Sequence, residues 1–390
     1  MMKPLEGLLV LDFSLFLAGP LCALRLADLG ARVIKVERPD GGDLCRSLYI
    51  SPTDIAGDST LFHAINRNKE SFAANLKDAG QLGQVKSLIA QADVMITNFR
   101  PGVMKRLGLD YPSVSKINPR LVYGAITGYG NDGPWVDKPG QDLLAQAMSG
   151  LMWLSGNADE NDTPVPMGLS AADMFAGHFL AQGILACLVR RGVTGSGGLV
   201  ETSLLEALLD FQFEVLTTYL NDGRRPPRRS AVGNASAYLA APYGVYRTTD
   251  GWLALAMIPL STLGPLIGLP DLSGVSRQES FDRRDEIKRR IADALRQKPT
   301  AHWLAVFEPV DVWCAPVLDW PTLVEHEAFK ALGWTRPMRH TSGRLMTACR
   351  GPIRIDGQPT VEPRPAPRIG EHQQSIAREY GLSAGAPERD

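Results

Sequence analysis

The sequence predicts an α/β fold in which a large domain with a parallel sheet is followed by a smaller α+β domain. Three observations carry this prediction: short β-type apolar runs alternate with helical segments, an Arg- and Pro-rich segment interrupts the pattern near residue 221, and a hairpin pattern follows it. The length of 390 residues fits two or three domains. With 44% hydrophobic and 21% charged residues, the composition is that of an ordinary globular protein.

The first half of the chain contains the alternation. In order, we expect a strand at 7–14, a helix at 21–30, a strand at 31–37, a helix at 82–91, and strands at 92–98 and 121–127. Elements that alternate in this way predict a parallel, Rossmann-like sheet with helices on its faces. Such sheets bind ligands at the carboxyl ends of their strands. We therefore expect the functional residues just after Ser14, Glu37, Asn98 and Thr127.

The second half changes character at residues 221–230, which read NDGRRPPRRS. This segment is interpreted as a solvated linker rather than a polyanion site, because no aromatic residues are interleaved with its arginines. Before it we expect a long helix at 171–190 and another apolar helix that ends at Tyr219. After it we expect a hairpin turning at Asp250-Gly251, an amphipathic helix at 281–297, a strand at 312–318, and a final segment, 361–390, that wraps the surface or frays.

Charge and cysteine content argue against several classes of protein. The 41 basic and 42 acidic residues give a net charge of −1, so long-range attraction to nucleic acid or to an anionic membrane is not expected. Five scattered cysteines without a CxxC pair favour neither a disulfide framework nor a zinc site, and we predict no metal. No signal-peptide pattern is evident, and the longest apolar helical stretch, 171–189, contains Asp173. We therefore expect a cytoplasmic protein that does not span a membrane.

A dinucleotide site is the first candidate for chemistry. The first strand–helix–strand unit ends in Glu37, where an acidic residue would hold a ribose. However, the turn after the first strand reads SLFLAGP and lacks the GxGxxG pattern that lets a backbone approach a pyrophosphate. A nicotinamide or flavin enzyme is therefore not favoured. The sequence also lacks GxSxG and HExxH motifs, which argues against a serine hydrolase or a metalloprotease.

A second candidate is a group of cations that follow the expected strands, namely Arg38, Lys77, Arg100 and Arg106. Each residue alone is an ordinary surface side chain. Together, at one edge of a sheet, they would hold a phosphorylated ligand through charge-assisted hydrogen bonds.

The third candidate is Asp173, in the segment SAADMFAG at the start of the helix at 171–190. Ser170 and Asp173 have the spacing of a capping box, in which the carboxylate only satisfies helix N–H groups. A helix N-terminus also stabilises an ionised carboxylate, which would leave Asp173 available as a nucleophile. From the spacing alone, the cap is the favoured interpretation.

Several motifs, in order along most of the chain, resemble the class III coenzyme A transferases of the CaiB/BaiF type, which include formyl-CoA and carnitine CoA-transferases. The segments that carry the resemblance are LADLGARVIKVERPDGGD, NRNKES, ADVMITNFRPGVMKRLG, INPRLVYGAITGYG, QDLLAQAMSG, SAADMFAG and RIGEH. The resemblance implies a discontinuous large CoA-binding domain (1–220 and 330–390), a linker and small α+β domain (221–329), and an interlocked homodimer.

The resemblance also implies a reaction, in which CoA passes from an acyl-CoA donor to a carboxylic acid acceptor. Asp173 matches the family's nucleophile, which forms a mixed anhydride and then an aspartyl-CoA thioester, so the preference for a pure cap is reversed. Asp142 matches an acidic position near the reacting centre and would equally serve as a helix-start acid. The implied CoA contacts are Leu17, Ala18, Arg38, Lys77, Asn98, Phe99, Arg100 and Arg106. CoA is a substrate in this family, and no tightly bound cofactor is expected.

Three departures from the family pattern bear on specificity. The glycine run that formyl-CoA transferases carry after the position of Asn234 is Ala-Ser-Ala-Tyr-Leu here, which argues against formyl or oxalyl specificity. Thr127 stands where a lysine is expected, and Gln141 stands where the related racemases carry a histidine, which argues against racemisation. An acyl-CoA racemase or lyase on the same scaffold, or a non-catalytic CoA-binding protein, are the alternatives to CoA transfer.

Overall fold

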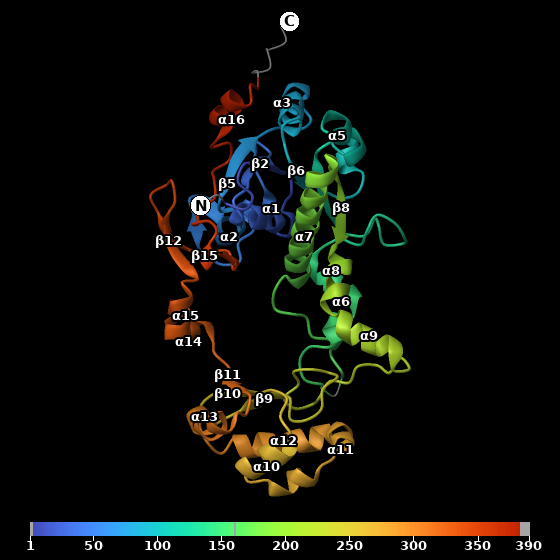
Figure 1. Ribbon diagram of the computed structural model, residues 1–390, viewed down its shortest axis with the longest axis vertical. Helices are drawn as coiled ribbons and strands as arrows, with labels where there is room; N and C mark the ends of the chain where they lie inside the picture. The colour runs from blue at the N-terminus through green and yellow to red at the C-terminus, as the bar shows by residue number, and fades with distance from the viewer. Residues whose placement is uncertain (1–2, 160, 383–390) are drawn as a thin grey trace, which may run out of the picture. The chain divides into compact units, whose positions relative to one another are not determined.

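The computed structural model describes residues 3–159 and 161–382, so the outermost residues of the predicted large domain lie outside it. The described chain divides into two compact units, each of which is treated by itself (Figure 1). The sheet unit comprises the residues up to Ala145, Ser170–Phe211 and the residues from Leu332 onward. The hairpin unit comprises Gln146–Leu169 and Gln212–Ala331.

A six-stranded parallel sheet forms the centre of the sheet unit, with the order β5-β2-β1-β6-β7-β8. The strands are β1 (Leu9–Asp12), β2 (Arg32–Glu37), β5 (Lys69–Ala73), β6 (Val94–Thr97), β7 (Val122–Thr127) and β8 (Gly198–Ser203). The predicted α/β class with a parallel sheet is therefore confirmed. Strand β8 was not predicted, because its glycine start and its mixture of buried and exposed residues give no continuous apolar run.

Helices cover both faces of this sheet. On one face α3 (Ala79–Ile89), α5 (Tyr111–Ile117) and α16 (Gln373–Glu379) enclose an apolar core that includes Leu11, Ile34, Phe72 and Leu88. On the other face lie α1 (Ala18–Asp28) and α7 (Ala171–Thr194), which pack on each other and on the strands. Because Ile376 of α16 is completely buried in the core, the expectation that the whole C-terminal segment wraps or frays is wrong for this helix.

Shorter elements complete the sheet unit. They are the helices α2 (Thr60–Asn66), α4 (Val103–Arg106) and α8 (Leu204–Phe211), the start of α6 (Asp142–Ser149), and three small two-stranded sheets, β3 (Asp54–Ile55) with β4 (Asp58–Ser59), β12 (Thr335–Arg339) with β13 (Leu345–Cys349), and β14 (Arg354–Ile355) with β15 (Gln358–Pro359).

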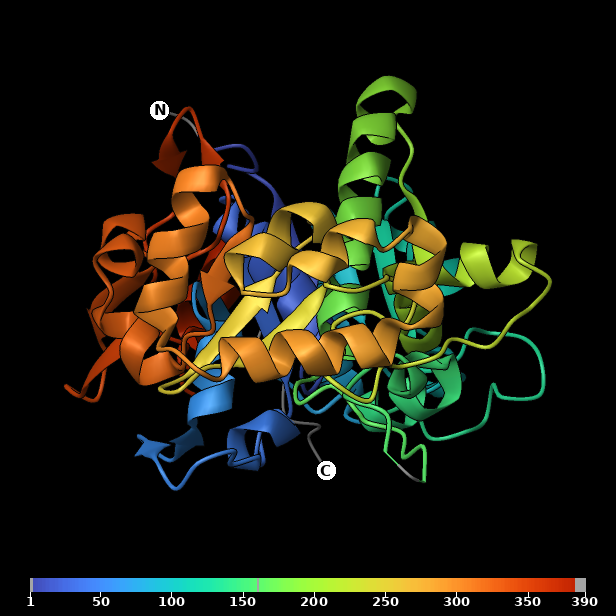
Figure 2. The same ribbon diagram turned by 90° about the horizontal axis from the view of Figure 1, so that it is seen from below.

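The hairpin unit is built on an antiparallel sheet in the order β11-β10-β9. Its elements are α9 (Phe213–Asn221), β9 (Gly244–Arg247), β10 (Trp252–Leu255), α10 (Leu260–Leu266), α11 (Arg277–Asp282), α12 (Arg284–Leu295), α13 (Thr300–Phe307), β11 (Cys314–Pro316), α14 (Trp320–Glu325) and most of α15 (Glu327–Leu332). The predicted hairpin and the strand at 312–318 are confirmed. Figure 2 shows α12 beside the yellow hairpin, and its Ile287, Ile291 and Leu295 are completely buried.

Two predicted helices are each split in the structure. The helix expected to end at Tyr219 is interrupted at Gln212, whose side-chain amide donates to the Ser149 carbonyl at 2.9 Å. The helix expected at 281–297 is interrupted at Arg283, so its basic outer face belongs to α12 alone. Neither break contains a proline or a glycine, so sequence alone does not reveal it.

Helix α7 is long and apolar enough to cross a membrane, and no other described helix meets that criterion. In its most apolar window, 39% of the residues are buried. These residues pack against α1 and β7, as expected for a core helix of the sheet unit.

Candidate active site

The carboxyl edge of the parallel sheet gathers the residues that were predicted to contact CoA. Because the strands are parallel, the segments that follow them emerge at the same edge, in the order of the strands. Lys77 follows β5, Arg38 follows β2, Leu17 and Ala18 follow β1, and the segment from Asn98 to Arg106 follows β6. Strands lie about 4.8 Å apart, so these four segments share an edge about 14 Å long.

The four cations of this edge are open to a ligand. Arg38, Lys77, Arg100 and Arg106 are all exposed, and none forms an ion pair with a described residue. Within the described part of the chain, the Arg38 guanidinium donates only to the Gly42 carbonyl, at 3.3 Å. Uncompensated positive charge along a sheet edge suits a ligand with several phosphates.

Asn98 and Phe99 support the edge from below. The Asn98 carboxamide accepts from the Leu15 N–H at 2.8 Å and donates to the Leu15 carbonyl at 2.7 Å, so it clamps the loop that joins β1 to α1. Phe99 is half-buried against the apolar core. The Asn98 side chain therefore holds the loop, and both its carbonyl oxygen and its amide nitrogen are hydrogen-bonded to Leu15.

Helix α7 approaches the first turn of α1 closely at Gly177. A Cβ atom at that position would lie 2.6 Å from the Ala18 carbonyl oxygen, so only glycine permits the approach. Asp173 precedes Gly177 by one helical turn and shares its face of α7. The two helices thus bring Asp173 toward the predicted CoA-binding loop.

Asp142 occupies the N-terminus of α7 in place of the predicted capping box. Its Oδ1 accepts from the backbone N–H of Ala172 at 2.7 Å and of Asp173 at 3.3 Å, whereas the Ser170 side chain forms no cap. The prediction that Ser170 and Asp173 cap the helix themselves is therefore wrong. No described residue donates a hydrogen bond to the Asp173 carboxylate, which leaves that group available for chemistry.

The position of Asp142 follows from a close contact between two glycines. A Cβ on Gly128, just after β7, would lie 2.6 Å from the Cα of Gly140, so the loop between them returns to the carboxyl edge. Helix α6 then begins at Asp142 beside the start of α7. The spacing of QDLLAQ in the sequence contains no sign of this loop closure.

Burial and the nearby Asp142 charge together raise the pKa of Asp173 to about 7. The N-terminal end of α7 favours the ionised carboxylate, which opposes this shift. Near neutral pH, a substantial fraction of Asp173 is therefore ionised, and its carboxylate is more basic than an exposed one. A weakly hydrated, basic carboxylate is a better nucleophile than an aspartate in water.

The chain matches the model of CoA-transferase family III over residues 5–373. It belongs to CoA-transferase family III. It is 36% identical to an acetyl-CoA:oxalate CoA-transferase of Acetobacter aceti, covering 97% of this chain and 96% of that one. It is 33% identical to a succinyl-CoA:glutarate CoA-transferase of Mus musculus, covering 97% and 86%. The crystal structure of a CaiB/BaiF family protein from Brucella suis matches with a TM-score of 0.83 at 30% identity, covering 97% and 100%.

This CoA-transferase is thus an enzyme that transfers CoA between acyl-CoA and carboxylic acids, as the resemblance implied. The structure also argues against a dinucleotide site, because Glu37, the residue expected to hold a ribose, is bonded within the protein. Glu37 is 3% exposed, and its carboxylate pairs with Arg46 at 2.7 Å and accepts from the Ser71 hydroxyl at 2.6 Å. A carboxylate so engaged does not reach a ribose.

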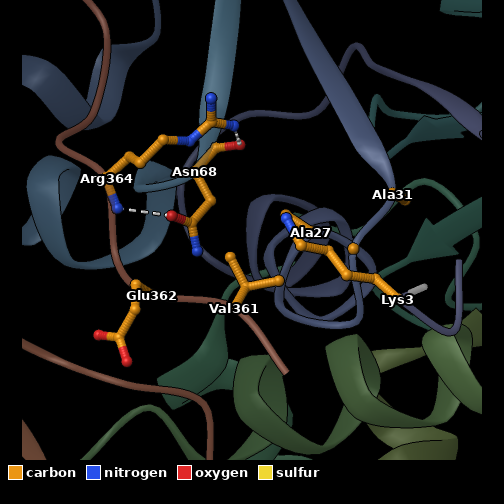
Figure 3. A pocket seen from close by; sticks show the side chains of 8 residues that line it. Lys3, Ala27, Ala31, Asn68, Val361, Glu362 and Arg364 are labelled. Atoms are coloured by element: carbon orange, nitrogen blue, oxygen red, sulfur yellow. Dashed lines mark hydrogen bonds between the residues drawn. The ribbon is translucent and has the colours of Figure 1, made fainter. Parts of the chain in front are cut away.

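Two cavities of the sheet unit are lined by none of the predicted site residues of this CoA-transferase. One, of about 340 Å³, lies where residues 361–364 run beside Asn68, whose Oδ1 accepts from the Arg364 backbone at 2.6 Å (Figure 3). The other, of about 440 Å³, lies among α1, α2 and β13 and is also lined by Met174, the neighbour of Asp173. Among the described residues, no group of three or more His, Cys, Asp or Glu side chains is placed to hold a metal.

Sequence reasoning overlooked the buried charges beneath the carboxyl edge, Asp12, Lys35, Asp43 and Lys69, which are all 0–3% exposed. A signal was present, because Asp12 and Lys35 interrupt otherwise apolar strands.

Proposed function

We propose that this enzyme transfers CoA from an acyl-CoA donor to a small carboxylic acid through covalent intermediates on Asp173. The observation that carries the proposal is the state of the Asp173 carboxylate. It is largely buried at the start of α7, has no hydrogen-bond donor among the described residues, and has its helix-capping role performed by Asp142. A carboxylate without a structural task, beside a loop predicted to bind CoA, is suited to attack a thioester.

The first step forms a bond between an Asp173 oxygen and the thioester carbonyl carbon. The C–S bond breaks, CoA leaves as its thiolate, and a mixed anhydride remains. The thiolate then attacks the Asp173 carbonyl of the anhydride, which forms the aspartyl-CoA thioester and releases the donor acid as a carboxylate. The acceptor carboxylate reverses these steps, so atoms and charge balance and no outside reactant is required.

Binding of CoA is assigned to the carboxyl edge. Arg38, Lys77, Arg100 and Arg106 supply the positive charge for the phosphates, and Leu17 and Ala18 lie beside the adenosine end. Asp142 acts on the reaction indirectly, because it caps α7 and its charge raises the pKa of Asp173. These residues lie in the sheet unit, so we assign the CoA site to the discontinuous large domain.

The acceptor is proposed to be a short dicarboxylic acid. Two relatives are named for oxalate and glutarate, an acetyl-CoA:oxalate and a succinyl-CoA:glutarate CoA-transferase. The sequence departure after Asn234 argues against oxalate, whereas the more similar of these two relatives is named for it. To decide between oxalate and a longer dicarboxylic acid, transfer rates are measured with oxalate, succinate and glutarate as acceptors. Acetate and butyrate serve as monocarboxylic controls.

We further propose a homodimer of interlocked chains that acts in the cytoplasm. The outer face of α7 supports an assembly, because Val189 is 73% exposed and Val193 is 87% exposed, while the half-buried Phe175 and Phe179 lie one and two turns after its start. Exposed apolar side chains in a row are typical of a surface that another chain covers.

The covalent intermediate tests the proposal directly. The enzyme is incubated with acyl-CoA, quenched with hydroxylamine, and digested, and the peptide containing Asp173 is weighed. Hydroxylamine converts an aspartyl-CoA thioester into a hydroxamate, which we expect on Asp173 in the wild type and not in Asp173→Asn. Transfer between acids without any modified Asp173 peptide, or full activity of Asp173→Asn, would contradict the mechanism.

A further inference from the structure

Four charged side chains lie directly beneath the loop that joins β1 to α1. Asp12 at the end of β1, Lys35 in β2, Lys69 in β5 and Asp43 in the segment after β2 are almost completely buried. Lys35 Nζ lies 2.8 Å from Asp43 Oδ2 and 3.9 Å from Asp12 Oδ2. Lys69 pairs with Asp12 at 2.8 Å, so two positive and two negative charges compensate one another.

Asp12, Lys35 and Asp43, together with Asn98, hold the backbone of the loop. The Ser14 N–H donates to Asp12 at 3.0 Å, and the Ser14 carbonyl accepts from Lys35 at 2.8 Å. Asn98 bonds both the N–H and the carbonyl of Leu15, and the Phe16 N–H donates to Asp43 at 3.1 Å. Five consecutive backbone groups thus each have a side-chain partner. We call Asp12, Lys35, Asp43 and Asn98 the loop network.

The loop is held in a conformation that it would not adopt freely. Phe16 has a φ of +61°, in the left-handed region, which costs a bulky residue about 1–2 kcal/mol. Its ring is nevertheless 45% exposed and gains little from burial. A strained residue persists only where its surroundings determine it, and such residues are frequent at ligand-binding sites.

The energetics also indicate a role other than stability. Burying an ion pair costs about as much desolvation free energy as the pairing returns, and apolar residues of similar volume often stabilise a fold at least as well. Burial alone would raise the pKa of Asp12. The charges of Lys35 and Lys69 outweigh this effect and lower the Asp12 pKa to about 2, so the carboxylate stays charged at neutral pH. What the network provides is a defined loop conformation.

We propose that the loop network is a positioning device that sets residues 14–17 for CoA binding, so that Lys35 and Asp43 control CoA affinity without touching CoA. This inference rests on the proposed function, which assigns CoA to this loop. It predicts that disrupting the network weakens CoA binding and leaves the chemical step on Asp173 nearly unchanged, since Asp173 is held separately by α7 and Asp142.

The test uses two matched double variants of the full-length enzyme. Lys35→Met/Asp43→Leu replaces one buried ion pair by apolar side chains, so that no unpaired charge remains there. Arg67→Met/Asp28→Leu removes another buried ion pair of the sheet unit, although Asp28 also pairs with Arg25 at 3.2 Å. Among the described residues, neither Arg67 nor Asp28 has a hydrogen bond or ion pair to residues 14–17. Isothermal titration with CoA gives the Kd, steady-state kinetics give kcat and KM for acyl-CoA, and thermal melting reports folding.

We expect the loop-network variant to raise the CoA Kd and the acyl-CoA KM by about tenfold or more, with kcat within about threefold of the wild type. The Arg67/Asp28 variant is expected to change stability while keeping the wild-type Kd. Lys35→Met/Asp43→Asn restores an acceptor for the Phe16 N–H and should recover part of the affinity.

An unchanged Kd in a folded loop-network variant, or an equal change in both double variants, would overturn the inference. If Lys35→Met/Asp43→Leu does not melt cooperatively, the single Asp43→Ala substitution decides. It removes the acceptor of the Phe16 N–H, while Lys35 keeps Asp12 at 3.9 Å. A wild-type Kd for this variant overturns the inference, and a rise of about threefold supports it. Failure of the proposed function is distinguishable, because the wild type would then bind CoA without forming any covalent adduct on Asp173 and without transferring CoA to any acid of the panel.

Discussion

The two faces of the parallel sheet differ near the carboxyl ends of β1 and β2, although they come from the same strands. On one face Leu11 of β1 and Ile34 of β2 are completely buried among apolar side chains. The other face is also apolar at Val10. Toward the carboxyl edge, however, Asp12 and Lys35, the direct neighbours of Leu11 and Ile34, are equally buried but charged. The apolar face supplies free energy of folding. The buried charges near the carboxyl edge contribute little free energy of folding and instead define the shape and reactivity of a site. Burial alone therefore does not tell which role a residue has.

Among the substitutions that test this difference between the two faces, Asp173→Asn is expected to have the largest effect on activity. Loss of the nucleophile should lower the transfer rate by about 10³-fold or more. The same change should stabilise the protein. Because the folded pKa of Asp173 is raised to about 7, the native state keeps a proton between about pH 4 and 7 that the unfolded chain has lost, and stability falls as pH rises through that window.

The measurement is therefore a pair of thermal melts. The Asn variant should melt at a higher temperature than the wild type at about pH 8, and the gap should narrow toward about pH 4 as the wild-type carboxyl becomes protonated. A variant that is inactive but less stable at pH 8 would show that Asp173 has a structural partner and would remove the contrast between the two regions.

The apolar face should respond in the opposite way. Leu88 of α3 is completely buried in the core, so Leu88→Ala is expected to lower the free energy of unfolding by about 2–5 kcal/mol. The kcat of the folded fraction should stay within about twofold of the wild type, because Leu88 is not itself a predicted site residue. Urea denaturation and kinetics on the same preparation measure both. A large loss of kcat in folded protein would mean that the core transmits strain to the carboxyl edge.

The sequence alone was sufficient to predict the parallel sheet with its apolar face and the family to which the chain belongs. Alternating elements and their order predicted the sheet, because burial imposes a periodicity that each strand and helix displays locally. Motif order placed Asp173 and the edge cations. What it did not reveal depends on groups distant in the chain: Asp142 caps α7 from α6, and Gly177 accommodates Ala18 from α1. The Ser170 spacing even predicted a cap that the structure gives to Asp142.

Gly177→Ala tests how closely α7 and α1 are set against each other. The added methyl group would lie 2.6 Å from the Ala18 carbonyl, so α1 and the loop before it must shift. We expect KM for acyl-CoA to rise about tenfold, with a modest loss of stability. Gly192→Ala is the matched control on the same helix, because nothing lies within 4 Å of its Cβ position. It should stabilise α7 slightly and leave KM unchanged, and equal effects of both substitutions would refute the packing argument.

The smallest and most specific effect concerns Asp142→Asn. Asparagine keeps an oxygen that accepts the N–H groups of Ala172 and Asp173, so the helix cap survives while the negative charge is removed. Since burial is the first cause of the raised Asp173 pKa and the Asp142 charge the second, the pKa should fall only partly, by about one unit or less. The acid limb of the pH profile of kcat/KM should then move to lower pH, because the ionised carboxylate is the nucleophile.

The control for this prediction is Asp132→Asn, at an exposed position in the loop before α6, which should leave the pH profile unchanged. A profile that moves to higher pH, or not at all, would mean that Asp142 acts on Asp173 through the cap and not through its charge.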